Sequence, residues 1–289
     1  MRTLDLFLLV FWSDQFCDSS FSTMKVQGLV ALITGGVSGF GKGFAEALLE
    51  KGGRAVSLVD ISDGKNVVDE FSNKFGADRV MYHHADVRSD SDMENAFERT
   101  VQAYRQLDVV CNNAGIANEI PDWKKVIDIN LTAVLRGTFL AKKYMDKKSG
   151  GKGGLVINVS SIAGLMYLPH FPVYCAAKHG VIGYSRSLAM PGAASAFSPD
   201  NIRINVVCPS FADTPIFETS SPRVPLEKIK AFKNSLPMVP VSDVVAAYMR
   251  LVEEDLHGEA IRITREKGID FHKFKDQPES DLSKIVFHD

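Results

Sequence analysis

The chain reads Leu29-Val-Ala-Leu-Ile-Thr-Gly-Gly-Val-Ser-Gly-Phe-Gly41 close to its start. The first six residues of this stretch are almost all apolar, as in a strand that is buried on both faces of a parallel sheet. Gly35, Gly39 and Gly41 follow, and they allow a sharp turn in which bare backbone N–H groups approach a phosphate at the N-terminus of the next helix. A strand, a glycine-rich turn and a helix in this order predict a dinucleotide-binding unit.

The same alternation continues along the rest of the chain. Short β-branched runs predict strands, and the stretches between them predict helices. The expected strands are residues 29–34, 55–59, 79–83, 107–111, 155–159, 202–207 and 260–264, and the expected helices are residues 41–51, 64–75, 91–104, 122–146, 173–189 and a stretch that starts near residue 242. Strands joined by crossover helices run parallel. The prediction is therefore an α/β fold, a doubly wound parallel sheet of Rossmann type with about seven strands and helices on both faces, in a single domain.

The composition excludes several classes of protein. The chain has 289 residues, of which 45% are hydrophobic and 24% charged, as in a globular protein. With a net charge of −2 and no long run of Lys or Arg, nucleic acid is not an expected partner. The four cysteines form no Cys-x-x-Cys pair, which indicates reduced thiols. The histidines lack metal-ligand spacing, so we expect no metal, and His83 and His84 should point to opposite faces of a strand.

Residues 1–23 precede the first strand as a leader whose role the sequence leaves open. Its apolar run, residues 6–12, is too short to span a bilayer, and no clear cleavage signal follows it. We favour a leader outside the fold, with an alternative start at Met24, and hence a cytoplasmic protein without a membrane span. A signal peptide, and therefore secretion, is the alternative. The single domain is expected to cover residues 24–289.

Residues 209–240 break the alternation of strands and helices. This stretch contains six prolines and no clear strand. A long irregular segment inside a compact domain is usually functional or disordered. We interpret it as a lid over the substrate.

Asp60 ends the second expected strand, at the edge of the sheet that carries the glycine turn. A carboxylate there can accept hydrogen bonds from both ribose hydroxyls and repels a 2′-phosphate, which favours NAD over NADP. A role as a helix N-cap or a surface carboxylate is the alternative. Asp86-Val87 and Asn112-Asn-Ala-Gly115 follow the third and fourth strands and extend the same edge.

Tyr174-Cys-Ala-Ala-Lys178 places a phenol and an ammonium group one helical turn apart on one face of a helix. Tyr144 and Lys148 have the same spacing, but they lie late in an earlier helix, and we interpret them as surface residues. Ser161 follows the strand before Tyr174, so its hydroxyl can return over the same crevice. The three polar groups are expected to converge there.

These residue types suit the oxidation of an alcohol, in which a hydride leaves carbon while a proton leaves oxygen. Free tyrosine, with a pKa of about 10, is a poor base at neutral pH. A neighbouring Lys178 ammonium and the nicotinamide cation are together expected to lower the pKa of Tyr174. The Ser161 hydroxyl is expected to hydrogen-bond the oxygen that develops charge.

The chain resembles the short-chain dehydrogenase/reductase family over about residues 25–270. The resemblance rests on Thr34-Gly-x-x-x-Gly-x-Gly41, Asn112-Asn-Ala-Gly115, Asn158-Val-Ser-Ser-Ile-Ala-Gly164 and Tyr174-x-x-x-Lys178, in the order of the family. It implies an NAD-dependent enzyme that interconverts a secondary alcohol and a ketone. It also implies Asn130 as a fourth catalytic residue beside Ser161, Tyr174 and Lys178, supporting a water in the proton relay. A homodimer through helices 122–146 and 173–190 is implied as well.

The motifs and the resemblance together give a set of expected cofactor-binding residues. They are Gly35, Ser38, Gly39, Phe40, Gly41, Asp60, Ile61, Asp86, Val87, Asn113, Ala114, Gly115, Tyr174, Lys178, Pro209, Ala212 and Thr214. Ser161, Phe171 and Tyr174 are expected to contact the substrate.

Further segments are similar to members of the family that oxidise an allylic alcohol on a lipid acid. They are Arg136-Gly-Thr-Phe-Leu140, Gly150-Gly-Lys-Gly-Gly154 and Lys267-Gly-Ile-Asp-Phe271. The similarity implies a hydroxy-lipid substrate. A smaller secondary alcohol, a steroid or a retinoid is the alternative, and a catalytically silent NAD-binding protein on the same scaffold is another.

The chain departs from those members at three places. Phe171 stands where they carry a glutamine that holds the substrate hydroxyl, and a phenyl ring cannot make that hydrogen bond. Pro209-Ser210 replaces a Pro-Gly pair on the nicotinamide side. Pro191 and Gly192 predict that the helix beginning near Tyr174 ends early.

Overall fold

The computed structural model describes residues 25–190, 202–217 and 238–274. The predicted leader and the central part of the predicted lid, residues 218–237, lie outside these ranges. Within them, no helix is both long and apolar enough to cross a membrane.

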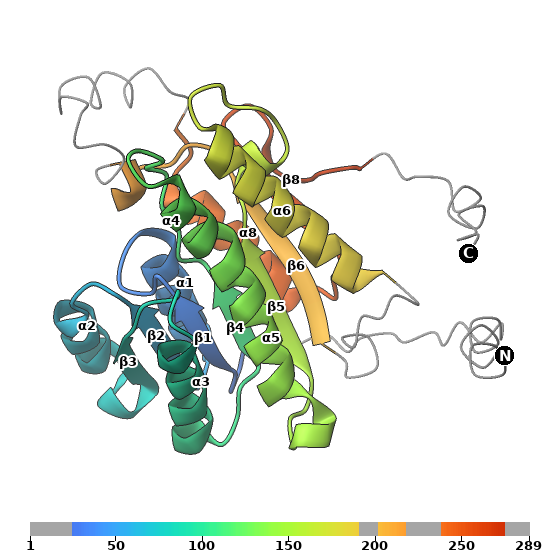
Figure 1. Ribbon diagram of the computed structural model, residues 1–289. Coiled ribbons are helices and arrows are strands. Elements are labelled where there is room, and N and C mark those ends of the chain that lie inside the picture. Colours follow the sequence, from blue (N-terminus) through green and yellow to red (C-terminus); the bar gives the residue numbers. More distant parts are fainter. Residues whose placement is uncertain (1–24, 191–201, 218–237, 275–289) are drawn as a thin grey trace, which may run out of the picture.

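One eight-stranded sheet runs through the described residues (Figure 1). Its strands are β1 (Val30–Thr34), β2 (Ala55–Asp60), β3 (Val80–His84), β4 (Val109–Asn112), β5 (Gly154–Val159), β6 (Ile202–Pro209), β7 (Ala260–Thr264) and β8 (Gly268–Phe271). Their order in space is β3-β2-β1-β4-β5-β6-β7-β8. The first seven run parallel, and β8 is antiparallel to β7. The direction of winding reverses between β1 and β4, which is where doubly wound sheets open a crevice for a ligand.

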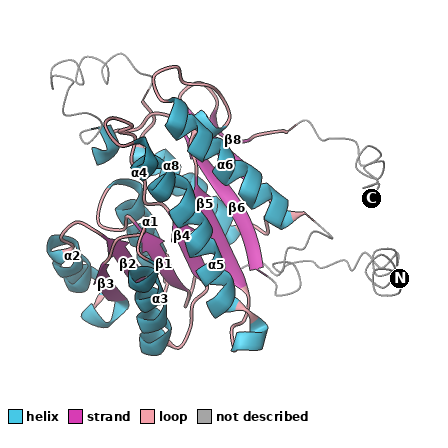
Figure 2. Ribbon diagram, viewed as in Figure 1, coloured by secondary structure: helices cyan, strands magenta, loops and turns pink. Residues whose placement is uncertain are grey.

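Helices cover both faces of this sheet (Figure 2). They are α1 (Gly39–Glu50), α2 (Lys65–Phe75), α3 (Asp90–Tyr104), α4 (Trp123–Ile127), α5 (Ala133–Met145), α6 (Pro172–Ala189) and α8 (Val241–Glu253). Short 3₁₀ turns occupy Ala77–Arg79, Lys147–Ser149, Ile162–Gly164 and Pro215–Phe217, and a π-helical turn occupies Asp128–Thr132. The chain therefore forms the doubly wound α/β fold that its sequence predicts.

Two apolar cores separate the layers, and the alternation of side chains along the strands fills both. Ile33 points into the core under α1, α2 and α8, while its neighbour Leu32 points into the core under α3 and α5. In the first core the rings of Phe44 on α1 and Tyr248 on α8 stack at 4.2 Å. Such an aromatic pair stabilises the packing by about 1 kcal/mol beyond the area it buries.

The structure departs from the sequence prediction in two elements. The helix expected over residues 122–146 is divided into α4, the π-helical turn and α5. Strand β8 was not predicted, because a half-buried edge strand of four residues carries little pattern of its own; it is held by its pairing with β7. The early end of α6 at Ala189, ahead of Pro191, is confirmed. So is the opposite exposure of His83, which is buried, and His84, which is exposed.

Candidate active site

A cavity of about 390 Å³ opens over the carboxyl ends of the parallel strands. Every predicted cofactor-binding residue except Gly41 lines it, and so do the predicted substrate residues Ser161 and Phe171. Its volume lies within the range of small-molecule sites. Residues from both halves of the chain, about 180 positions apart, thus share one crevice.

The glycine turn forms one wall of this cavity. Gly35 has a positive φ of 63°, and its N–H donates to Val59 O at 2.8 Å, which fixes the turn against β2. A Cβ at Gly41 would come within 2.1 Å of Gly35 O and 2.7 Å of Asn113 Nδ2. Gly41 therefore lets α1 approach the turn from behind, and it is not among the residues that line the cavity.

Thr34 and Asn113 join the glycine turn to the end of β4. Thr34 Oγ1 accepts from the N–H groups of Asn113 and Ala114 at 2.9 and 3.0 Å. Asn113 Nδ2 donates to Thr34 O at 2.9 Å and to Gly35 O at 3.2 Å. These hydrogen bonds hold the glycine turn and the end of β4 at a fixed separation across the crevice.

Asp60 is almost buried, with 9% of its surface exposed, and its carboxylate lies in the cavity wall. Its Oδ1 accepts from Ser62 N at 2.9 Å and its Oδ2 accepts weakly from Val37 N at 3.3 Å. A carboxylate has about four lone pairs, so acceptor capacity remains for a pair of ribose hydroxyls. The bare turn, this carboxylate and the size of the cavity fit a dinucleotide.

Ser161, Tyr174 and Lys178 converge at the other end of the cavity, as the sequence predicts. The ammonium of Lys178 lies 5.5 Å from the centre of the Tyr174 ring and donates to Val159 O at 2.9 Å. Ser161 Oγ donates to Pro209 O at 3.4 Å, and the Ser161 hydroxyl lies close enough to Tyr174 to lower the pKa of its phenol. A phenol, a hydroxyl and an ammonium therefore face one small volume.

The first turn of α6 presents Tyr174. Pro172 occupies the first helical position, where its missing N–H leaves no bond unmade. The backbone N–H of Tyr174 donates to Glu119 Oε1 at 2.6 Å. Glu119 thereby caps α6 from the loop after β4 and ties that loop to the helix that bears the phenol.

Burial displaces the pKa values of both groups. Burial raises the pKa of Tyr174 to about 12, although the Ser161 hydroxyl acts in the opposite direction. Burial lowers the pKa of Lys178 to about 8. From the protein alone, the loss of water therefore outweighs the neighbouring groups for both side chains, and Lys178 by itself does not bring the phenol pKa below its ordinary value.

Asn130 does not line the cavity, although the family resemblance implied it as catalytic. It lies in the π-helical turn, where its Nδ2 donates to Ile116 O at 2.7 Å and Val126 O at 3.0 Å. Its Oδ1 accepts from Ile116 N at 3.2 Å. These bonds fasten the loop after β4 to the π turn, so the side chain acts from behind the cavity wall.

Several residues that line the cavity were not predicted. Arg88 stands two positions beyond Asp86, and its place at a strand end was the signal that could have found it. Ile116 and Leu168, apolar residues of loops that carry no motif, line the cavity together with Phe171. Phe211 and Ile216 line it as well, and they belong to the predicted lid, residues 209–240. Among the described residues, the charged groups that line the cavity are Asp60, Asp86, Arg88, Lys125 and Lys178.

Comparison with known proteins identifies the class. A family model described as short chain dehydrogenase matches residues 29–224. A solved structure of levodione reductase superposes with a TM-score of 0.72 at 26% identity, covering 83% of this chain and 98% of that one. The chain belongs to the short-chain dehydrogenase family.

Curated relatives narrow the comparison. The 15-hydroxyprostaglandin dehydrogenase [NAD(+)] of Mus musculus is 38% identical over 265 residues, which are 88% of this chain and 97% of the relative. That of Homo sapiens is 36% identical over 270 residues, 88% of this chain and 98% of the relative. The (-)-trans-carveol dehydrogenase of Rhodococcus erythropolis is 33% identical over 265 residues, 80% of this chain and 93% of the relative. The chain is an NAD-dependent oxidoreductase that acts on a secondary alcohol.

Proposed function

We propose that this enzyme oxidises the secondary alcohol of a hydroxy-lipid to a ketone with NAD, and that Tyr174 transfers the proton. The observation that carries the proposal is the convergence of Ser161, Tyr174 and Lys178 beneath an apolar wall, at the opposite end of one cavity from Asp60. Relatives named for the oxidation of 15-hydroxyprostaglandin support the substrate class.

Each side chain has a task that follows from its chemistry. The Ser161 hydroxyl donates to the substrate oxygen and holds it next to the Tyr174 oxygen. The Tyr174 oxygen then takes the hydroxyl proton as the substrate oxygen develops charge, and the proton that the phenol already carries passes to the uncharged amine of Lys178. When bound, NAD supplies the carbon that accepts the hydride. Asn130 maintains the π turn behind the site, and the residues of the glycine turn hold the pyrophosphate with their backbone N–H groups.

Lys178 makes Tyr174 a usable base. The pKa of Lys178 is about 8 and that of Tyr174 about 12, so at neutral pH the phenol is protonated and the amine is mostly charged, and the amine reaches its midpoint near pH 8. When Lys178 and Tyr174 have together lost one proton, near pH 8, the two side chains can accept the alcohol proton between them. The apparent pKa belongs to the pair and not to either group.

Asp60 selects the cofactor. Its carboxylate lies in the cavity wall next to the glycine turn, where it accepts from the ribose hydroxyls and repels a 2′-phosphate. This arrangement supports NAD as the working cofactor.

The substrate end of the cavity supports an apolar carbon chain around the reacting alcohol. Phe171, Leu168 and Phe211 line it, and among the described residues Lys178 is the cation near the reacting groups. Because Phe171 cannot hydrogen-bond the hydroxyl, the oxygen depends on Ser161 and Tyr174. Phe211 and Ile216 belong to the first part of the predicted lid, residues 209–240, which we propose closes over this end.

A smaller allylic alcohol is the second candidate. The similarity to (-)-trans-carveol dehydrogenase favours it, and so does the apolar wall. A cyclic monoterpene alcohol needs no group that recognises a carboxylate.

A panel of alcohols tests the proposal. NADH formation is followed by absorbance with hydroxy fatty acids, prostaglandins, carveol, a hydroxysteroid and cyclohexanol. The proposal predicts that kcat/KM for at least one hydroxy-lipid exceeds that for carveol and cyclohexanol by about tenfold or more, since each buried methylene contributes about 0.8 kcal/mol. A higher kcat/KM for carveol would support the second candidate, and absence of NADH with every alcohol would refute both.

A further inference from the structure

The turn after β3 carries an arginine inside the dinucleotide cavity. Arg88 lines the cavity together with Asp60, Asp86 and Val87. Ala85 N donates to Asp60 O at 2.9 Å, so the end of β3 directly adjoins the residue that faces the ribose. Arg88 therefore lies at the adenosine end, far from Tyr174 along the crevice.

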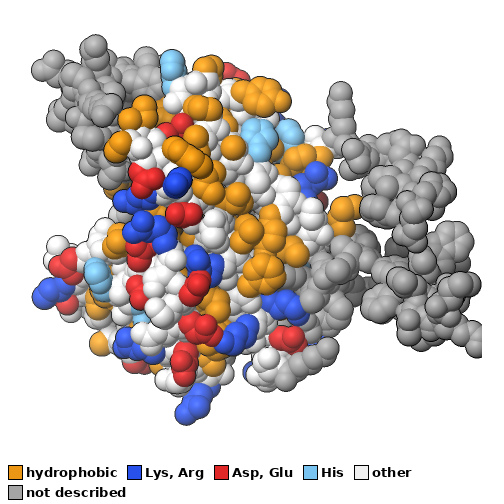
Figure 3. All heavy atoms as spheres, viewed as in Figure 1, with side chains coloured by type: hydrophobic (Ala, Val, Ile, Leu, Met, Phe, Trp, Pro, Cys, Tyr) orange, Lys and Arg blue, Asp and Glu red, His pale blue; other side chains and the backbone are white. Residues whose placement is uncertain are grey.

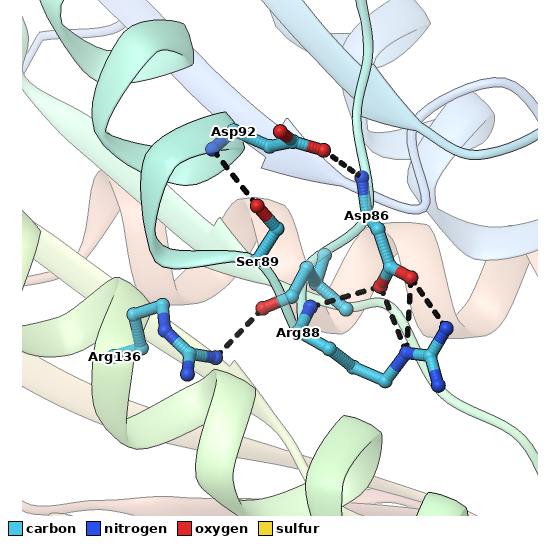
Figure 4. Close-up of polar contacts among 6 residues, drawn as sticks. Asp86, Arg88, Ser89, Asp92 and Arg136 are labelled. Carbon is cyan, nitrogen blue, oxygen red and sulfur yellow. Dashed lines mark hydrogen bonds and ion pairs between the residues drawn. The ribbon is translucent and has the colours of Figure 1, made fainter.

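The guanidinium of Arg88 is fixed in orientation by Asp86 (Figure 4). Its Nη2 donates to Asp86 Oδ2 at 2.6 Å, and its Nε lies 3.1 and 3.0 Å from the two carboxylate oxygens. The backbone N–H of Arg88 donates to Asp86 Oδ1 at 2.9 Å as well. This pairing lowers the pKa of Asp86, so the pair stays ionised at neutral pH.

The turn that bears this pair is itself held from two helices (Figure 4). On α3, Asp92 Oδ2 accepts from Asp86 N at 3.0 Å, and Ser89 caps the same helix by accepting from Asp92 N at 3.2 Å. From α5, Arg136 Nη1 donates to Val87 O at 2.8 Å. The turn therefore needs little ordering when a ligand binds, which favours affinity.

The pair offers a planar, overall neutral surface. Asp86 balances the charge of Arg88, and the nearby Asp60 carboxylate opposes any further anion. A 2′-phosphate is therefore a poor match. A guanidinium plane that stays partly exposed, at 40% of the side-chain surface, is well suited to stack on an aromatic ring. Ile61 and Val87 add apolar surface at the same end of the cavity.

We propose that Arg88, held by Asp86, contacts the adenine ring of the cofactor and contributes to its affinity. The inference rests on the same dinucleotide site as the proposed function, but it concerns binding and not the chemical step.

Binding measurements test it without turnover. Dissociation constants of NADH, ADP-ribose, NADPH and reduced nicotinamide mononucleotide are measured by fluorescence and calorimetry for the wild type, Arg88→Ala and Arg265→Ala. Arg265 is an exposed arginine in the turn between β7 and β8 and is the matched control. Arg88→Ala should raise the Kd of NADH and ADP-ribose by about 2- to 30-fold. The mononucleotide, which lacks adenine, should keep its Kd within about twofold, and Arg265→Ala should change none of these values.

Several outcomes would overturn the inference. An unchanged Kd of NADH in Arg88→Ala would show that Arg88 and Asp86 form a surface ion pair that does not contact the cofactor. An equal weakening of the mononucleotide would indicate a distorted site, and a weakening confined to NADPH would assign Arg88 to the 2′-phosphate. Should Arg88→Ala fail to fold, Arg88→Met keeps the aliphatic packing and should give the same loss of affinity for NADH. NADH binding by the wild type with no turnover of any alcohol would refute the proposed function and leave this inference standing.

Discussion

Lys178 and Tyr174 form a buried pair in which both pKa values are displaced by the loss of water. Lys178 is 3% exposed, and its pKa of about 8 lies close to working pH, while that of Tyr174 rises to about 12. The titration that matters for catalysis is therefore the first proton lost by the pair. The pH dependence of the reaction is therefore set by two side chains that lie one helical turn apart.

The pH dependence of the rate follows from these pKa values. Oxidation needs the pair to accept a proton, so kcat/KM for the alcohol should rise with pH and level off above an apparent pKa of about 8. Reduction of the ketone needs the pair to donate one, so its kcat/KM should be level at low pH and fall above the same value. Lys178→Met leaves a phenol with a raised pKa, and the rise should move beyond pH 9. Initial rates between pH 6 and 10 check this, and a rise that stays near pH 8 in Lys178→Met would exclude the lysine from the titration.

At the scale of elements, the π-helical turn between α4 and α5 shapes the loop that follows β4. Asn130 makes hydrogen bonds to the backbone of Ile116 and Val126, and it lies against Gly115, where an added Cβ would come 2.7 Å from its Oδ1. The π-helical turn is thus held by the contacts of Asn130 with the loop after β4. Its geometry positions the residues from Asn113 to Ile116 along the cavity.

Removal of the Asn130 side chain should loosen this turn. Asn130→Ala leaves the half-buried backbone groups of Ile116 without their side-chain partner, and we expect a loss of about 1–3 kcal/mol in the free energy of unfolding and weaker NADH binding. Denaturant unfolding and NADH fluorescence measure the two effects. Asn73→Ala, at an exposed position on α2, is the control and should be nearly neutral. An Asn130→Ala protein as stable as the wild type would show that the π turn does not depend on this side chain.

The sequence predicted those elements that are specified by residues close together in the chain. The buried run that became β1, the glycines after it and the Tyr174–Lys178 spacing each specify their own structure, so the sheet, the crevice and the catalytic end followed from them. The bonds of Asn130 to Ile116 and of Glu119 to Tyr174 join segments 14 and 55 residues apart. No periodicity encodes such contacts, so neither the π turn nor the cap of α6 was predicted. Arg88 lacked a motif for the same reason.

At the scale of the whole molecule, α5 and α6 present an apolar surface to the outside. Phe139 on α5 is 59% exposed, and its ring centre lies 6.3 Å from that of Tyr184 on α6. The space-filling view shows hydrophobic side chains gathered over the upper and right part of this face, while charged ones gather at the lower left (Figure 3). Exposed apolar patches of this kind mark interaction sites, and we propose that two copies of the chain pair through these helices.

A charge placed in this surface should prevent pairing. Phe139→Glu puts a carboxylate where an apolar ring would be buried, which is costly without a partner, so we expect a monomer at micromolar concentration. Light scattering after size exclusion gives the mass of each variant. Asn73→Glu adds the same charge on the opposite face of the sheet and should remain dimeric. A wild-type protein of monomer mass would refute the proposed pairing outright.

The most direct test of the account is a single turnover in which NADH appears after rapid mixing of enzyme, NAD and the best alcohol of the panel. Tyr174→Phe keeps the ring and removes the oxygen that takes the proton. We predict that the rate of NADH formation falls by about 10²- to 10⁴-fold while the Kd of NADH stays within about twofold of the wild type. A Tyr174→Phe enzyme that forms NADH within tenfold of the wild-type rate would contradict the claim that this phenol takes the proton.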